Sequence, residues 1–186
     1  MKDIFLALVH HPIKNKRGSL VTTSVTNLDI HDISRSCKTF GVKNYFIVTP
    51  ISKQQELVSK ILGHWDSDRA SDYNPDRQDA LSDTLVLSSV EDCIERITKE
   101  YGKRPVVVAT GANFEDYLGE ETAMREKFSS IDNPPCLLLF GTGWGLHSEL
   151  DRLIDYRLEP IFGVNSSYNH LSVRSAVAIY LDRLTR

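Results

Sequence analysis

The sequence alternates short, uninterrupted apolar runs with segments whose apolar residues recur at helical spacing. Runs such as IFLALV (residues 4–9), VVVAT (106–110) and LLLF (137–140) are almost entirely apolar. A strand exposed on one face alternates apolar and polar residues, whereas a strand covered on both faces does not. The pattern therefore predicts an α/β fold: a mainly parallel sheet of about six strands with helices on both faces.

The expected elements follow one another along the whole chain. Strands are predicted at residues 4–12, 44–50, 84–90, 104–113, 134–145 and 156–164, and helices at residues 27–41, 52–65, 90–102, 120–130, 146–154 and 170–184. Asn27 is expected to cap the first helix. Two polar segments, 13–26 and 66–83, are expected to be loops. No linker or internal repeat interrupts the pattern, so a single domain covering residues 1–186 is expected.

Composition limits the partners of the protein. The net charge is −3, so no global positive field would attract nucleic acid, and an RNA contact needs a local patch or a second subunit. The single cysteines Cys37, Cys93 and Cys136 lack Cys-x-x-Cys spacing, which argues against a disulfide framework and a cysteine zinc site. The first apolar run is too short for a membrane span and lacks a signal-peptide cleavage pattern. A cytoplasmic protein without membrane association is expected.

The stretch LLLFGTGWGLHSEL, residues 137–150, passes from an apolar run through Gly141, Gly143 and Gly145 into a helical pattern. Glycines between a strand and a helix bring the backbone close to a small ligand. A Rossmann dinucleotide site would place them after the first strand, not near the fifth. A P-loop is excluded because no Gly-Lys-Ser/Thr occurs. A serine hydrolase would require a Gly-x-Ser-x-Gly elbow, whereas Trp144 stands at the centre of Gly143-Trp144-Gly145.

Glycines stand at the ends of three of the late strands. Thr110 and Gly111 end one, the three glycines end the next, and Phe162 and Gly163 end the last. The carboxyl ends of parallel strands lie along one edge of a sheet, where α/β proteins bind their ligands. The sequence thus predicts one binding rim formed by three loops.

These segments, taken together, resemble the three motifs of the SPOUT RNA methyltransferases. The motifs match RSCKTFGV (residues 35–42), LLLFGTGWGL (137–146) and YNHLSVRSAVAIYL (168–181), in that order. The opening VHHP, KRG and VTTSVTNLDIHDI, with NHLSVRSAVA, resembles an uncharacterised bacterial branch of that family. The resemblance covers essentially the whole chain. It implies a deep C-terminal trefoil knot, a homodimer, and transfer of a methyl group from S-adenosylmethionine to a nucleotide of structured RNA, either tRNA or rRNA.

The resemblance also implies that the cofactor lies among the knot loops and is held mostly by backbone groups. Glycines fit such a site because a missing Cβ lets the main chain touch a flat base. The residues assigned to the cofactor are Thr110, Gly111, Phe140, Gly141, Thr142, Gly143, Gly145, Leu146, Ile161, Gly163, Tyr168, Asn169, His170, Leu171, Ser172 and Val173.

Four basic residues are candidates for RNA binding, and a fifth for catalysis. Lys14, Lys16 and Arg17 form the clearest basic cluster near the start of the chain. Arg174, in an otherwise apolar helix, either forms a structural ion pair or contacts RNA across a dimer interface. Arg35 matches the motif arginine, whose planar guanidinium can grip phosphate; the alternative is an ordinary solvated arginine.

Two departures from the ribose-methylating branch leave the methylated atom open. That branch has an Asn six positions before the motif arginine, where this sequence has Asp29, and it has a Glu that GTGWGL lacks. The acceptor is therefore a ribose oxygen or a base nitrogen. A SPOUT-fold protein that binds cofactor or RNA without catalysis, and a dehydrogenase-type nucleotide-binding protein, are the alternative functions.

No metal site is expected. His10 and His11 are adjacent on a strand, so their side chains point to opposite faces and cannot easily share an ion. His170 is expected to have a structural or substrate-polar role. Trp144 packs either under the cofactor loop or in the core. The segment Asn165–Tyr168 is either a plain turn or, by the resemblance, part of the knot.

Overall fold

The structure, a computed structural model, describes residues 3–66, 74–128, 134–164 and 168–186. Six strands form one sheet in the order β5-β4-β1-β7-β6-β8, and every neighbouring pair is parallel. The strands are β1 (Ile4–Val9), β4 (Tyr45–Val48), β5 (Thr84–Leu87), β6 (Val106–Thr110), β7 (Cys136–Gly141) and β8 (Tyr156–Arg157). This arrangement confirms the predicted parallel α/β sheet.

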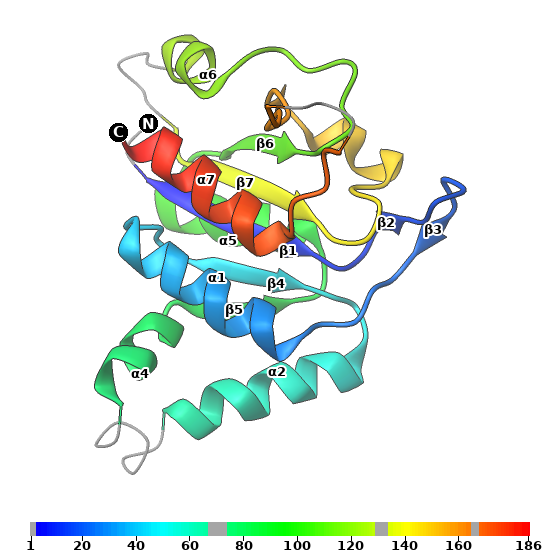
Figure 1. Cartoon of the computed structure of the whole chain (residues 1–186). Helices are drawn as coiled ribbons and strands as arrows, with labels where there is room; N and C mark the ends of the chain where they lie inside the picture. The colour runs from blue at the N-terminus through cyan, green and yellow to red at the C-terminus, as the bar shows by residue number, and fades with distance from the viewer. Residues whose placement is uncertain (1–2, 67–73, 129–133, 165–167) are drawn as a thin grey trace.

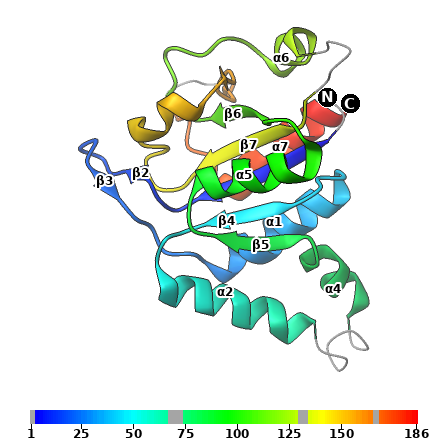
Figure 2. The same cartoon turned by 180° about the vertical axis from the view of Figure 1, so that it is seen from behind.

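Helices cover both faces of the sheet (Figures 1 and 2). The helices are α1 (Asn27–Thr39), α2 (Ser52–Trp65), α4 (Pro75–Leu81), α5 (Val90–Tyr101), α6 (Glu121–Lys127) and α7 (Val173–Thr185), with a 3₁₀-helix η1 (Ser148–Leu153). One core contains α1 and α7 packed on strand residues such as Leu8 and Leu138. A second core contains α5 and η1 on the alternate residues of the same strands, such as Ala7 and Leu139. Apolar neighbours on both faces explain the uninterrupted apolar runs.

Several sequence predictions about individual elements were wrong. Residues 13–26 contain a hairpin of β2 (Ile13–Lys14) and β3 (Leu20–Val21), and residues 66–83 contain α4. The segment before α4 has Asn and Pro, which suggest a turn but here cap and begin a helix. Residues 146–154 form a 3₁₀-helix rather than an α-helix. The last predicted strand is limited to β8, so residues 158–164 lie outside any strand.

Helix capping also differs from the prediction. Thr26, not Asn27, caps α1, because its hydroxyl accepts the backbone N–H of Asp29. Ser172 caps α7 in the same way, so that helix begins at Val173 rather than at residue 170. In both places a hydroxyl satisfies an N–H group of the first turn.

The trefoil knot stays a prediction. Residues 165–167, part of the predicted turn or knot segment Asn165–Tyr168, lie outside the described residues. Within the described parts of the chain, no helix is both long and apolar enough to cross a membrane.

Candidate functional site

A cavity of about 770 Å³ opens where β6 and β7 end, between these strands and the start of α7. We call it the rim cavity, and its volume lies in the range of small-molecule sites. The residues assigned to the cofactor that line it are Thr110, Gly111, Phe140, Gly141, Thr142, Gly143, Gly145, Leu146, Ile161, Asn169, His170, Leu171 and Val173. Gly163, Tyr168 and Ser172 are not among its lining residues. The loops after β6 and β7 thus meet at one cavity, as the predicted rim requires, whereas of the third predicted strand end Ile161 lines it and Phe162 and Gly163 do not. That this rim binds the cofactor stays a prediction.

The glycine loop, residues 141–146, forms one wall of the rim cavity. Gly143 and Gly145 have φ angles of +58° and +100°, which favour glycine, and the Gly145 N–H donates to the Thr142 carbonyl at 3.0 Å. A Cβ on Gly141 would lie 2.7 Å from the backbone nitrogen of Leu146. The loop therefore needs these glycines for its own conformation, whether or not a ligand is bound.

The β2–β3 hairpin is fastened to the glycine loop by its backbone. The Lys14 N–H donates to the Gly145 carbonyl at 3.0 Å, and the Trp144 N–H donates to the Lys14 carbonyl at 3.3 Å. The Thr23 and Thr142 hydroxyls are hydrogen-bonded, and Thr142 also donates to the Val9 carbonyl at 3.0 Å. The segment predicted as a basic loop is thus a hairpin that is hydrogen-bonded to the cavity wall, and its Lys14 lines the cavity.

His10 lies buried beneath this junction. Its Nδ1 is 3.0 Å from the Thr23 hydroxyl, and its buried Nε2 has no hydrogen-bond partner among the described residues. Burial lowers the pKa of His10 to about 4, although the charge of Asp29 acts to raise it. The imidazole is therefore neutral at pH 7.

The neighbouring His11 bonds elsewhere, with its Nδ1 2.9 Å from the Thr22 hydroxyl. The two histidines thus have separate partners. In the part of the chain that the structure describes, no three His, Cys, Asp or Glu side chains are grouped so that they could hold a metal ion.

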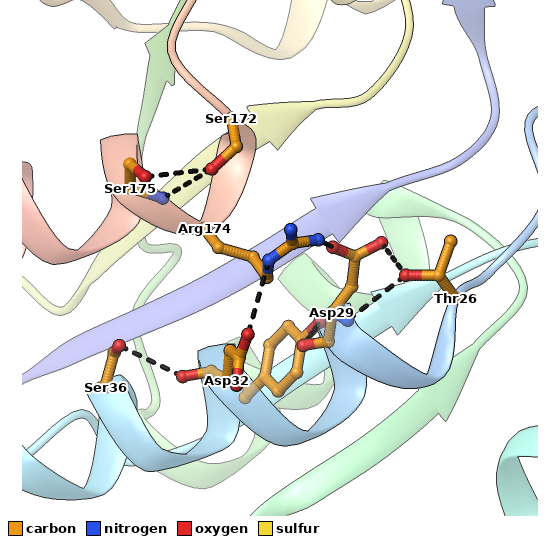
Figure 3. Close-up of polar contacts among 8 residues, drawn as sticks. Thr26, Asp29, Asp32, Ser36, Ser172, Arg174 and Ser175 are labelled. Atoms are coloured by element: carbon orange, nitrogen blue, oxygen red, sulfur yellow. Dashed lines mark hydrogen bonds and ion pairs between the residues drawn. The ribbon is translucent and has the colours of Figure 1, made fainter.

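Side chains of α1 and α7 form another part of the lining of the rim cavity. Figure 3 shows the polar contacts between these two helices. Arg174 donates from Nη1 to the Asp29 carboxylate at 2.9 Å, and its Nε lies 3.3 Å from the Asp32 carboxylate. Thr26 donates its hydroxyl proton to the second Asp29 oxygen at 2.6 Å. Asp29 is only 5% exposed. Of the two roles predicted for Arg174, the structure has the ion pair, and it joins the first and last helices.

The floor of the rim cavity is aromatic. The rings of Phe140 and Tyr180 lie 6.0 Å apart in an edge-on arrangement, and both line the cavity. The Tyr180 hydroxyl donates to the Glu159 carbonyl at 2.7 Å, and burial raises the pKa of this phenol. The Asn169 amide donates to the Ala112 carbonyl at 3.0 Å and so ties the segment before α7 to the loop after β6.

Three of the predicted basic residues lie outside the cavity. Arg35 is exposed on α1, is not a lining residue, and forms no ion pair with any residue that the structure describes. Lys16 and Arg17 are exposed at the tip of the hairpin, where the Asn15 side chain accepts the Arg17 N–H at 2.8 Å and the Ser19 N–H at 3.0 Å. A single chain therefore does not bring Arg35 to the cavity.

Some lining residues were not predicted from sequence: Thr23, Ser24, Thr26, Asp29, Ala112, Asn113, Phe114, Trp144, Ala176 and Tyr180. The spacing Thr26-x-x-Asp29 resembles a helix-capping pattern and could have marked two of them. The others carry no local signal. Trp144 is 47% exposed, which excludes the core position among its two predicted alternatives; the position under the cofactor loop stays a prediction.

The parallel sheet and the cavity at the carboxyl ends of its central strands define an α/β protein of the nucleotide- or cofactor-binding class. A model of the family described as "SAM-dependent RNA methyltransferase" matches residues 3–186. The chain belongs to this family, whose cofactor is S-adenosylmethionine.

Relatives and solved structures agree with that family. A protein named tRNA (guanine-N(1)-)-methyltransferase from Oleidesulfovibrio alaskensis is 42% identical over 98% of this chain, which covers 42% of that protein. An uncharacterized protein from Aquifex aeolicus is 37% identical over 98% of the chain and 88% of that protein. A probable methyltransferase from Bordetella pertussis Tohama I has the same fold, with a TM-score of 0.63, 14% identity, and coverage of 98% of this chain and 94% of that one.

One further structural neighbour bears on the cofactor. The SpoU methyltransferase AviRb from Streptomyces viridochromogenes, described in complex with AdoMet, has a TM-score of 0.52 and 20% identity, covering 98% of this chain and 56% of that one. The rim cavity of this chain fits such a molecule. Phe140, Ile161 and Leu171 offer apolar surface for a flat base, and the glycine loop offers backbone without Cβ atoms.

Proposed function

We propose that this chain transfers the methyl group of S-adenosylmethionine to a nucleotide of structured RNA, either tRNA or rRNA. The observation that carries the proposal is the rim cavity, which combines a glycine-closed loop with a basic hairpin in a member of an RNA methyltransferase family. When bound, S-adenosylmethionine supplies a methyl group activated by its sulfonium. The chain supplies position and orientation, which are large effects in catalysis.

The acceptor is the open part of the proposal. The two relatives named as guanine-N1 methyltransferases are each covered to 42% by this chain, so that activity belongs to proteins more than twice its length. Their name makes guanine in tRNA the first acceptor to test, with ribose oxygens second. The single-domain arrangement over residues 1–186 and the knot remain part of this proposal.

Within the proposed site, the side-chain wall has a positioning role. Asp29 and Asp32 hold Arg174 by two carboxylates, which fixes α7 against α1 beside the cavity mouth. We assign RNA contacts to Lys14, Lys16 and Arg17, because these charges lie on one hairpin beside the cavity. The proposed role of Arg174 is structural, since its charge is already neutralised by two acids.

We keep the proposed role of Arg35 in orienting the acceptor. Because Arg35 lies outside the rim cavity of its own chain, it would act on RNA that extends from the cavity or at the cavity of a second subunit. We therefore also propose a homodimer. Exposed apolar side chains around the cavity mouth and at the start of α1, including Leu28 and Leu171, support a partner surface there. Three buried free thiols support the proposed cytoplasmic, reducing compartment.

The test of the cofactor is isothermal calorimetry with S-adenosylhomocysteine and NADH. We expect binding of the first and none of the second; the reverse result would favour a dehydrogenase-type protein. Methyl transfer is then measured with labelled S-adenosylmethionine and bulk bacterial tRNA or rRNA. Cofactor binding without transfer to either RNA would favour the non-catalytic SPOUT-fold alternative.

Arg35→Ala sharpens the same experiment. Because Arg35 is exposed and outside the cavity, we expect unchanged cofactor affinity and unfolding midpoint but slower single-turnover transfer. The Arg35→Lys variant should recover little of the lost rate, since lysine lacks the planar fork. A wild-type transfer rate in Arg35→Ala would show that this residue is an ordinary surface arginine.

Sedimentation equilibrium at micromolar concentration tests the proposed homodimer. A molecular mass equal to that of one chain would contradict it.

A further inference from the structure

Trp144 is a large apolar side chain in an unusual position. It lines the rim cavity yet is 47% exposed. Tryptophan is usually well buried, so a half-exposed indole at a cavity mouth needs a reason. Its place is set by the backbone on either side: Gly143 and Gly145 both have positive φ, and the Trp144 N–H donates to the Lys14 carbonyl at 3.3 Å. The conformation of the loop backbone therefore holds this ring where it is exposed to solvent.

Positive charge lies beside the ring. Lys16 Nζ lies 5.8 Å from the centroid of the Trp144 ring, and Lys14 lines the same cavity. From Pro12 to Thr26 the sequence has three basic residues and no acidic one. None of Lys14, Lys16 and Arg17 forms an ion pair with another residue in the described ranges. In a protein with a net charge of −3, this is a local positive patch around an exposed aromatic face.

The patch does not match the cofactor. S-adenosylmethionine is a net cation at pH 7, because its sulfonium and ammonium groups outweigh its single carboxylate, so two nearby lysines do not complement its overall charge. An RNA strand offers the complementary pair, a flat base for the indole and phosphates for the lysines. An unpaired nucleotide fits better than a duplex, because bases inside a duplex have no free face for a side chain.

We propose that Trp144 is the stacking platform for an unpaired nucleotide of the RNA substrate, with flanking phosphates on Lys14 and Lys16. The inference rests on the proposed RNA substrate and adds where and how that substrate is held. The hairpin and the glycine loop then form one unit: the backbone bonds between Lys14 and residues 144–145 keep the basic groups at a fixed distance from the ring. Because stacking reads only the flat face of a base, the platform tolerates any of the four bases.

The experiment measures binding of a fluorescein-labelled, unstructured RNA strand of mixed sequence, and of the same strand in a stable duplex with its complement, by anisotropy at fixed salt. We expect the wild type to prefer the single strand. Trp144→Ala should bind it about five-fold to a hundred-fold more weakly, as expected for the loss of one stacked base. Trp144→Phe should recover most of the affinity. Tyr117→Ala, an exposed aromatic that does not line the cavity, is the matched control and should bind like the wild type.

Lysine substitution separates charge from stacking. Lys16→Ala should reduce the salt dependence of binding by about one counterion, whereas Trp144→Ala should leave that slope unchanged. Circular dichroism and the unfolding midpoint show that each variant is folded. A variant that fails to fold is replaced by Trp144→Leu, which keeps apolar bulk but offers no aromatic face.

Each outcome decides the inference. Unchanged affinity of Trp144→Ala for the single strand overturns it. Loss of S-adenosylhomocysteine binding in the same variant, by calorimetry, overturns it too, because the indole then belongs to the cofactor. A drop in sedimentation mass with no effect on RNA binding assigns the ring to a second copy of the chain. If the platform binds RNA but the wild type transfers no methyl group, the proposed function fails and this inference stands.

Discussion

The two walls of the rim cavity are built by different physics. The glycine loop, residues 141–146, is a wall of backbone whose shape depends on missing Cβ atoms and on hydrogen bonds to the hairpin. The wall from α1 and α7 is made of side chains, among them an ion-paired group in which Asp29 and Asp32 hold Arg174. An added Cβ in the glycine loop collides with backbone, whereas the loss of one ion-pair partner of Arg174 leaves the other in place. The comparison teaches which substitutions abolish the site and which only weaken it.

His10 connects the two walls. Its imidazole bonds with Thr23, which bonds with Thr142 of the glycine loop, and it senses the charge of Asp29 on the other side. Among the described residues the hydrogen-bond chain ends at His10, whose Nε2 has no partner, and Asp29 acts on the imidazole through its charge.

The largest effect is expected for Gly141→Ala. The new Cβ would lie 2.7 Å from the Leu146 nitrogen, and since that atom is backbone the loop must move. We expect binding of S-adenosylhomocysteine to weaken by more than about a hundred-fold, roughly 3 kcal/mol, as measured by calorimetry. Gly63→Ala is the control, because nothing lies within 4 Å of its added Cβ. In helix α2 it should stabilise the fold by roughly 0.5–1 kcal/mol and leave binding unchanged. Full affinity in Gly141→Ala would mean that the backbone wall is adaptable.

A smaller effect is expected when His10 is titrated. Its folded pKa of about 4 lies below the ordinary value of 6.5, so the unfolded chain takes up the proton first. This contribution to stability is fully present above pH 6.5 and is lost as the pH falls towards 4. Between pH 7 and pH 5 the free energy of unfolding should fall by about 2 kcal/mol from this group.

The measurement is urea unfolding at both pH values for the wild type and His10→Asn, whose amide can replace the Nδ1 bond to Thr23. The difference between the two pH values should shrink by about 2 kcal/mol in the variant. An equal pH dependence in both proteins would show that other groups dominate and that His10 does not hold the junction in its neutral form.

The smallest effects are expected at the side-chain wall. Asp29→Asn removes the buried partner of Arg174. The Arg174 side chain is 32% exposed and keeps Asp32 as a partner, so we expect the free energy of unfolding to fall by about 1–2 kcal/mol. Asp32→Asn, at an exposed partner, should cost less than about 1 kcal/mol. Urea unfolding at pH 7 ranks the two. Equal losses would show that burial of Asp29 adds nothing to the pair, and the contrast between the walls would weaken.

Some features of the molecule could be predicted locally. The continuous runs in β1 and β7 indicated strands covered on both faces, since the side chains of both faces are apolar. The glycines after β7 indicated a tight loop at the carboxyl edge, because φ above zero favours glycine. The hairpin of β2 and β3 was missed, since two-residue strands leave no periodic pattern to detect.

The sequence by itself determined the strands of the six-stranded sheet, their parallel arrangement and the glycine loop, because apolar runs and glycines are patterns of a few neighbouring residues. Only the tertiary structure decided that Arg174 pairs with Asp29, 145 residues earlier in the chain. It also placed Trp144 half-exposed beside Lys16 rather than in the core, and left Arg35 outside the cavity. Partners of a charge or an exposed ring are set by which elements pack together, and no local pattern along the chain records that choice.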